Sequence, residues 1–136
     1  MILMRISLST PSLAGNEESY VREAIETEWV STAGPYVERF SQAFVKWLGE
    51  DLIAVPCVCG TAALHLSLLG VGVKPGDEVL VSSLTFIASA NAISQCGATP
   101  WLFDVEPESW TLDFGQVAAC LRDKTKRQDG NLIHKP

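Results

Sequence analysis

The sequence predicts an α/β fold in which helices flank a mainly parallel sheet. From residue 52 onward, short apolar runs that suit buried strands alternate with longer segments that suit helices. Such alternation is typical of βαβ units, whose strands run parallel. Before that point, the apolar residues recur at helical spacing only. We therefore expect a helical segment over residues 1–50, followed by the start of an incomplete α/β domain over residues 51–136.

Two helices are predicted in the first segment. Asn16 is a favourable N-cap for the stretch EESYVREAIETE, whose glutamates suit the positive end of a helix dipole. Residues 31–35 then interrupt the pattern. A second apolar stripe runs from Tyr36 to Leu48, and Gly49 follows at a position where glycine commonly ends a helix.

The α/β part begins with a nearly continuous apolar run, LIAVPCV, over residues 52–58. Such a run predicts a strand that is covered on both faces. The helix predicted over residues 61–71 has almost no polar face, so we expect it to be buried. The other predicted elements are strands over residues 79–83 and 99–105, helices over residues 86–96 and 114–121 (the latter capped by Asp113), and a turn at Asp129-Gly130 that leads into a further strand.

Composition and charge exclude several classes of protein. The chain is 47% hydrophobic and 19% charged, and none of its apolar runs approaches the roughly 20 residues that span a bilayer. The net charge is -6, and half of the basic residues lie in the last fifteen positions, which leaves an acidic body that disfavours nucleic-acid binding. No secretory signal is visible, so we expect a cytoplasmic protein without a membrane or nucleic-acid partner.

A metal site is not predicted. The cysteines form no CxxC pair, and the two histidines lie outside the spacing of zinc ligands. Buried, reduced thiols are the expected state of Cys57, Cys59, Cys96 and Cys120.

The clearest candidate for a ligand site is the turn Cys59-Gly60-Thr61-Ala62, which joins a predicted strand to a predicted helix. Ligands of open α/β sheets bind beyond the carboxyl ends of the strands, and a helix N-terminus offers N–H groups to a phosphate. The alternative, which spacing alone favours, is that Thr61 simply caps its own helix. Phe86 is predicted at the same edge, either stacked on a planar ligand or packed in the core.

Three further features of the sequence are weaker candidates for a ligand site. The stretch GVGVKPG follows a helix rather than a strand, so it is interpreted as a helix end and a surface turn, not as a phosphate loop. His65 lies in an apolar helix and is expected to be packed there. Asp104 ends a predicted strand where ligands often bind, but capping of the following turn is the alternative.

Four segments, in the right order, resemble the N-terminal portion of the DegT/DnrJ/EryC1/StrS aminotransferases: LSTPSLAGNEESYV, TEWVSTAGPYVERF, GTAALHLSLLGVGVKPGDEVLV and SSLTFIASANAISQCGATPWLFDVEPESWTLD. These enzymes carry pyridoxal 5'-phosphate (PLP) and place amino groups on nucleotide-linked keto sugars. The resemblance implies the large domain of fold type I, as in aspartate aminotransferase. NAISQCGATPWLFDVEPESWTLD and RQDGNLIHKP are most similar to the branch that makes amino sugars for legionaminic- or bacillosamine-type glycans.

The resemblance assigns cofactor-binding residues. Gly60, Thr61 and Ala62 match the phosphate-binding turn of the family. Phe86 matches the aromatic residue that stacks on the pyridine ring of PLP. Cys59 stands where the family usually has Asn or Ser.

A second group is implied near the substrate. Trp29, Val30 and Ser31 match a segment that lies close to the active site and faces the sugar. Glu28, just before them, stands where the family usually has Gly.

The resemblance also implies what these 136 residues lack. Family members are much longer, and their Schiff-base lysine and the aspartate that pairs with the pyridine nitrogen match nothing in this chain, so no catalytic residue is assigned. The full-length parent is expected to be a homodimer that transfers an amino group from glutamate to a 4-keto nucleotide sugar. The chain itself is expected to be truncated and inactive alone. A PLP-dependent sugar dehydratase and a non-catalytic phosphate- or nucleotide-binding module are the alternatives.

Overall fold

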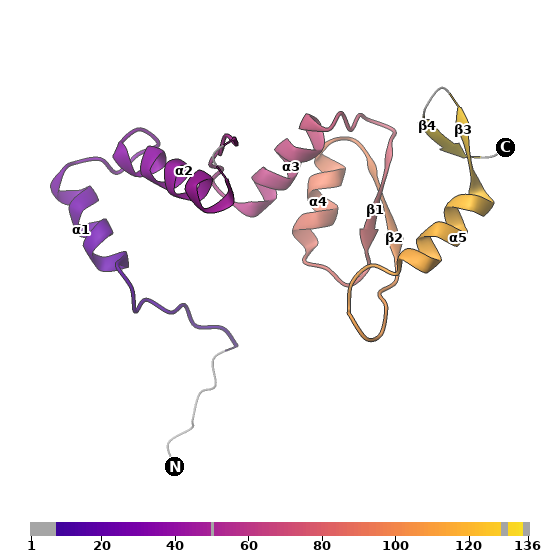
Figure 1. The fold of residues 1–136 in the computed structure, drawn as a ribbon, viewed down its shortest axis with the longest axis horizontal. Coiled ribbons are helices and arrows are strands. Elements are labelled where there is room, and N and C mark those ends of the chain that lie inside the picture. The colour runs from indigo at the N-terminus through magenta and orange to yellow at the C-terminus, as the bar shows by residue number, and fades with distance from the viewer. Residues whose placement is uncertain (1–7, 50, 129–130, 135–136) are drawn as a thin grey trace, which may run out of the picture. The chain divides into compact units, whose positions relative to one another are not determined.

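The fold is known from a computed structural model, which describes residues 8–49, 51–128 and 131–134. The chain divides into two compact units, Met1–Pro56 and Cys57–Pro136 (Figure 1). The first unit contains two helices, α1 (Glu17–Glu26) and α2 (Pro35–Leu48). The second contains α3 (Gly60–Gly70), β1 (Glu78–Ser82), α4 (Ile87–Gln95), β2 (Thr99–Phe103), α5 (Phe114–Lys124), β3 (Thr125–Gln128) and β4 (Asn131–His134).

A cluster of four side chains joins α1 to α2. The Tyr36 hydroxyl donates to Glu23 Oε2 at 2.7 Å, and the Arg39 guanidinium donates to Glu23 Oε1 at 3.3 Å. Arg39 also lies over the rings of Tyr20 and Tyr36, at 5.4 Å and 4.7 Å from their centroids. Desolvation, followed by the hydrogen bond to Glu23, raises the pKa of Tyr36 above its ordinary value. The cluster therefore ties together the two helices that flank the loop between them.

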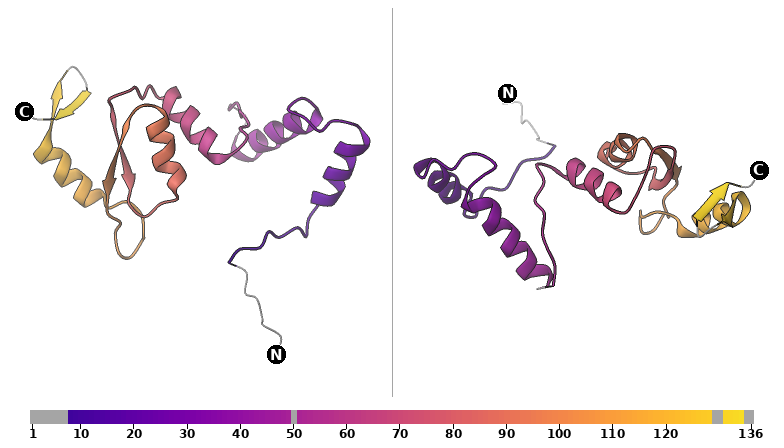
Figure 2. Two further views of the ribbon diagram at one scale, coloured as in Figure 1. Left: turned by 180° about the vertical axis from the view of Figure 1, so that it is seen from behind. Right: turned by 90° about the horizontal axis from the view of Figure 1, so that it is seen from above.

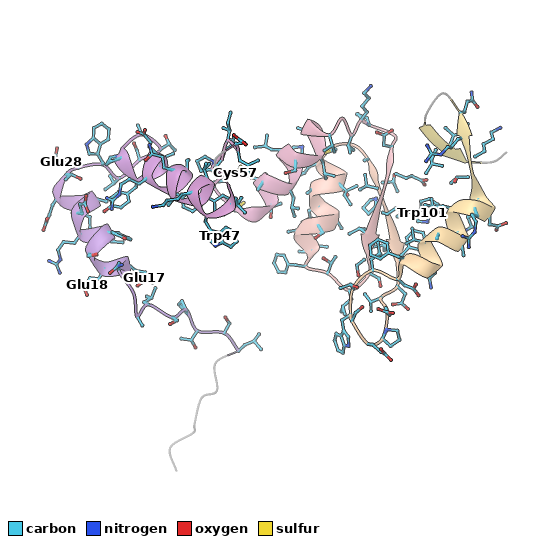
Figure 3. All side chains as sticks on the ribbon, in the orientation of Figure 1. Glu17, Glu18, Glu28, Trp47, Cys57 and Trp101 are labelled. Carbon is cyan, nitrogen blue, oxygen red and sulfur yellow. The ribbon has the colours of Figure 1, made fainter. Side chains whose placement is uncertain are left out.

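The end of α1 is fixed by a Schellman motif. The N–H of Glu28 donates to the carbonyl of Ile25 at 3.1 Å, and that of Trp29 donates to the carbonyl of Ala24 at 3.0 Å. Glu28 occupies the left-handed position that this motif requires, with φ of 62°. Its side chain extends from the turn after α1 (Figure 3).

The same motif ends α3 and α4, but with glycine at the left-handed position. Gly72 has φ of 90° and Gly97 has φ of 73°. A residue with a Cβ atom pays roughly 1–2 kcal/mol in this conformation, whereas glycine adopts it without steric cost. Glu28 is therefore the exception among the three helix ends, and it holds the backbone conformation that glycine would favour.

We expect Glu28→Gly to stabilise the chain by about 0.5–1 kcal/mol, because relief of the left-handed strain outweighs the added flexibility of the unfolded chain. Urea unfolding followed by circular dichroism measures the change. The matched control is the reverse substitution Gly72→Ala, at a position where an added Cβ meets no atom within 4 Å. It should destabilise by about 1 kcal/mol. A loss of stability in Glu28→Gly would show that the Glu28 side chain makes a stabilising interaction.

The second unit is built on two parallel strands. β1 pairs with β2 in a register that places Leu80 opposite Trp101, and α4 connects them. α4 packs against α3 and beside both strands, as the two views of Figure 2 show. Alternate residues of β1, Val79 and Val81, contact the small core that α4 covers. The buried centre of that core is formed by Ile93, Cys96 and Ala98, with Leu68 and Val73 packed against it.

Most of the predicted elements are confirmed, including the α/β class, the parallel pairing and the helix N-cap at Asp113, which accepts a hydrogen bond from the N–H of Gln116 at 2.9 Å. Two burial predictions are wrong: α3 has no buried residue, and of the four cysteines only Cys96 is buried, while Cys59 is exposed. Asn16 occupies the predicted N-cap position, but its side chain makes no capping hydrogen bond. β3 and β4 pair antiparallel around the predicted Asp129-Gly130 turn, which itself lies outside the described residues.

The strand predicted over residues 52–58 is wrong. The structure has no strand there, and the side chains are largely exposed, with Ile53 92% and Val58 95% accessible. A strand needs a hydrogen-bonding neighbour, and the parallel sheet of the described residues consists of β1 and β2 alone. The apolar run is therefore present without a sheet partner, and two parallel strands form instead of the expected three.

Candidate functional site

The N-terminus of α3 presents a row of backbone donors. Cys59 is the N-cap, with φ of -161° and ψ of 167°, and the first helical hydrogen bond runs from Ala63 N to Cys59 O at 3.1 Å. The N–H groups of Gly60, Thr61 and Ala62 therefore have no acceptor within the helix. Thr61 is the second helical residue, so the alternative that its side chain is the N-cap is wrong.

The space beside Gly60 is open. A Cβ atom built on Gly60 meets no heavy atom within 4 Å. Three N–H groups without a helical acceptor and the positive end of the helix dipole suit a phosphate. The residues present therefore fit the phosphate group of PLP.

Phe86 lies at the start of the neighbouring helix. It is the N-cap residue of α4 and follows the carboxyl end of β1. Its ring is 79% exposed, so it is not the core residue that the alternative interpretation expected. Beside it, the hydroxyls of Thr85 and Ser89 lie 3.1 Å apart. The phosphate donors and this exposed ring lie on two helices of the same unit, α3 and α4, which pack together.

The predicted substrate residues lie in the first unit, on the loop between α1 and α2. Trp29 is 51% exposed and Val30 74% exposed. The Ser31 hydroxyl accepts a weak hydrogen bond from the N–H of Ala33 at 3.5 Å. The sequence-based prediction gave no role to Gly34 at the end of this loop, although a Gly-Pro pair is a recognisable turn signal.

The three weaker candidates, Asp104, GVGVKPG and His65, are part of the local structure. Asp104 Oδ1 accepts from the N–H of Val105 at 2.8 Å, so this carboxylate serves the following turn. GVGVKPG is confirmed as a helix end and a turn: Gly72 ends α3, and Gly76, with φ of 88°, follows Pro75 as in a type II turn. His65 is half-buried on α3.

No group of three or more His, Cys, Asp and Glu side chains is placed to hold a metal ion in the part of the chain that the structure describes. Within the same residues, no helix is long and apolar enough to cross a membrane. A groove of about 810 Å³ lies against the amino-terminal ends of β1 and β2, with α5 and β4 on its other side. It contains none of the predicted site residues, and it lies at the opposite ends of the strands from Phe86.

Comparison with known proteins gives a consistent result. A family model described as the DegT/DnrJ/EryC1/StrS aminotransferase family matches residues 11–127. The GDP-perosamine synthase of Caulobacter vibrioides is 46% identical over 124 residues, which make up 91% of this chain and 33% of that protein. The chain thus spans about a third of the length of the curated relatives it matches.

Solved structures agree with the family match. The aminotransferase TlmJ from Streptoalloteichus hindustanus superposes with a TM-score of 0.71 and is 34% identical, covering 85% of this chain and 31% of its own. The E. coli GDP-4-keto-6-deoxy-D-mannose-3-dehydratase, solved with bound hydrated PLP, gives a TM-score of 0.72 at 17% identity, over 91% of this chain and 31% of its own. At that identity, the dehydratase shows a shared fold only.

Proposed function

The chain belongs to the DegT/DnrJ/EryC1/StrS aminotransferase family, whose aminotransferases use PLP, and from this premise we propose that it forms the phosphate-binding part of a PLP-dependent sugar aminotransferase. The observation that carries the proposal is the N-terminus of α3, where three consecutive N–H groups have no helical acceptor and a Cβ built on Gly60 meets no atom within 4 Å. In this proposal, residues 51–136 are the beginning of the cofactor-binding domain.

Each residue of the site has a distinct task. The N–H groups of Gly60, Thr61 and Ala62 bind the phosphate, and the Thr61 hydroxyl adds a further donor. Phe86 covers one face of the pyridine ring and excludes water from it. When bound, PLP supplies a conjugated ring that accepts the electron pair released at the reacting carbon. These residues hold the ring in place. None of them is assigned a role in proton transfer.

The proposed reaction is transfer of an amino group from glutamate to a 4-keto nucleotide sugar, in the synthesis of surface polysaccharides. A GDP-linked sugar is the first substrate to test, because a 46%-identical relative is named a GDP-perosamine synthase. Assignment to the legionaminic- or bacillosamine-type branch stays a prediction, as does a homodimer. The dehydratase alternative rests on likeness of fold alone. The non-catalytic module is disfavoured, because the matched family is one of aminotransferases.

Three small molecules test the site in the 136-residue chain. Pyridoxine 5'-phosphate has the ring and the phosphate of PLP but no aldehyde, so it reports non-covalent binding without imine formation at surface lysines. We expect it to shift the amide resonances of Thr61 and Ala62 in ¹⁵N NMR, and to bind weakly and reversibly. Pyridoxine, which lacks the phosphate, should bind at least about tenfold more weakly, because it makes no charge-assisted hydrogen bonds.

PLP itself should behave as pyridoxine 5'-phosphate does. None of the lysines matches the Schiff-base segment of the family, so borohydride should trap no single lysine selectively. Equal affinity for pyridoxine and its phosphate, or shifts confined to residues remote from α3, would contradict the proposed site.

A further inference from the structure

Two hydroxyl groups meet across the residue that begins α4. Thr85 precedes Phe86, the N-cap of this helix, and Ser89 lies in its first turn. The two hydroxyl oxygens are 3.1 Å apart, so one donates a hydrogen bond to the other. The N–H of Ser89 also donates to the carbonyl of Phe86 at 3.1 Å. The side chain and the backbone of Ser89 therefore both act on the segment that carries Phe86.

The backbone before Phe86 is held as well. The N–H of Ser83 donates to the carbonyl of Phe103 at 2.8 Å, next to the last paired residues of β1 and β2. The Ser82 hydroxyl accepts from the N–H of Leu84 at 3.2 Å. Hydrogen bonds thus hold the chain on both sides of Phe86, from the end of β1 to the first turn of α4.

The Phe86 side chain, in contrast, has little packing around it. It is 79% exposed, so few neighbouring atoms fix the direction of its ring. The rotamers open to such a side chain depend on the backbone that carries it, here with φ of -68° and ψ of 140°. The hydrogen bonds that hold these two angles therefore also limit the directions that the ring can take.

We propose that Thr85 and Ser89 are positioning residues: the hydrogen bond between their hydroxyls holds the Phe86 ring in the orientation that covers the pyridine ring of the cofactor. The cofactor half of this inference rests on the proposed function. Affinity falls in proportion to the fraction of the protein that is in the binding-competent conformation. Equal use of three staggered rotamers would leave about a third of the Phe86 rings competent, so the hydrogen bond contributes up to about threefold in affinity.

The first measurement needs no ligand. In the isotope-labelled chain, the three-bond couplings from the backbone nitrogen and carbonyl carbon of Phe86 to its Cγ report the populations of its rotamers. We expect one dominant rotamer in the parent and more even populations in Ser89→Ala and in Thr85→Val. Because both substitutions remove the same hydrogen bond, the double variant should show the same populations as either single variant. Unchanged couplings in both single variants would overturn the positioning role.

Ligand binding separates positioning of the ring from support of the helix. Ser89→Ala should weaken pyridoxine 5'-phosphate about two- to threefold and leave inorganic phosphate unchanged, because inorganic phosphate has no ring to cover. Ser89→Thr keeps the hydroxyl and should bind both probes as the parent does. The matched control is Ser94→Ala, which removes a hydroxyl that donates to the carbonyl of Ala90 at 3.0 Å near the other end of α4. It should change the affinity for neither probe.

The possible outcomes separate this inference from the proposed function. Equal weakening of both probes by Ser89→Ala, or the same loss in Ser94→Ala, would show that the hydroxyl supports the helix and would overturn the inference. A parent chain that binds neither probe would overturn the proposed function and, with it, the cofactor half of the inference. The couplings of Phe86 decide the positioning half in either case.

Discussion

Substituting Gly60 by proline should abolish most of the affinity of the chain for pyridoxine 5'-phosphate while leaving the fold intact. Proline is favoured at the first position of a helix and removes only its own N–H group there. Cys59 already has the extended backbone that precedes proline readily. Because a hydrogen bond to a charged group is worth roughly 1.5–3 kcal/mol, and the proline ring also enters the open space, we expect a loss of about tenfold to a hundredfold.

The matched control is Phe114→Pro at the first position of α5. It removes one N–H group from another helix of the same unit, where Asp113 already supplies a capping acceptor. We expect no change in ligand affinity. Thr61→Val provides a graded comparison, because it keeps the N–H and removes the hydroxyl, and its effect should be smaller than that of Gly60→Pro. Thermal unfolding should show Gly60→Pro to be at least as stable as the parent. Retained affinity in a stable Gly60→Pro variant would mean that the phosphate binds elsewhere.

The parts of the fold that the sequence predicted correctly depend on local patterns. α1, α2 and α4 follow from apolar residues at helical spacing, and the start of α5 follows from Asp113, whose side chain caps it. β1 and β2 follow from short apolar runs separated by a helix, a connection that is long enough for parallel pairing and is typical of it. The start of α3 was predicted from the turn residues Cys59 and Gly60 in front of an apolar helix, although the strand expected before them does not form. The phosphate site at this helix end stays a prediction.

What the sequence could not predict depends on neighbours that a local pattern does not contain. The apolar run over residues 52–58 has the composition of a covered strand, but a strand also needs a hydrogen-bonding partner from another part of a chain. Gly34, with φ of 133°, lies against the Trp29 side chain, and this contact was missed because an unusual φ value leaves no mark on hydrophobic periodicity. Glu28 differs again: a glutamate gives no local signal for a left-handed residue, yet two backbone hydrogen bonds of the Schellman motif hold it there.

Phe86 gives the second large effect that we expect, and it separates the ring from the phosphate. The side chain is 79% exposed, so Phe86→Ala should cost little stability. Stacking of an aromatic side chain on a planar ring is worth roughly 1–3 kcal/mol, so the affinity for pyridoxine 5'-phosphate should fall at least about fivefold. Inorganic phosphate has no ring to stack, and its weak binding, measured through the Thr61 and Ala62 amides, should be unchanged by Phe86→Ala.

Gly60→Pro and Phe86→Ala should therefore differ in which of the two probes, inorganic phosphate and pyridoxine 5'-phosphate, they weaken. Gly60→Pro should weaken both inorganic phosphate and pyridoxine 5'-phosphate, because both depend on the N–H groups at the start of α3. Phe86→Ala should weaken only the probe that carries a ring, and Phe86→Tyr should restore it, because the aromatic face is kept. The neighbouring Ile87, 63% exposed on the same turn, provides the control Ile87→Ala, which should alter neither probe. If Phe86→Ala weakened both probes equally, the residue would act by shaping the first turn of α3 rather than by covering the ring.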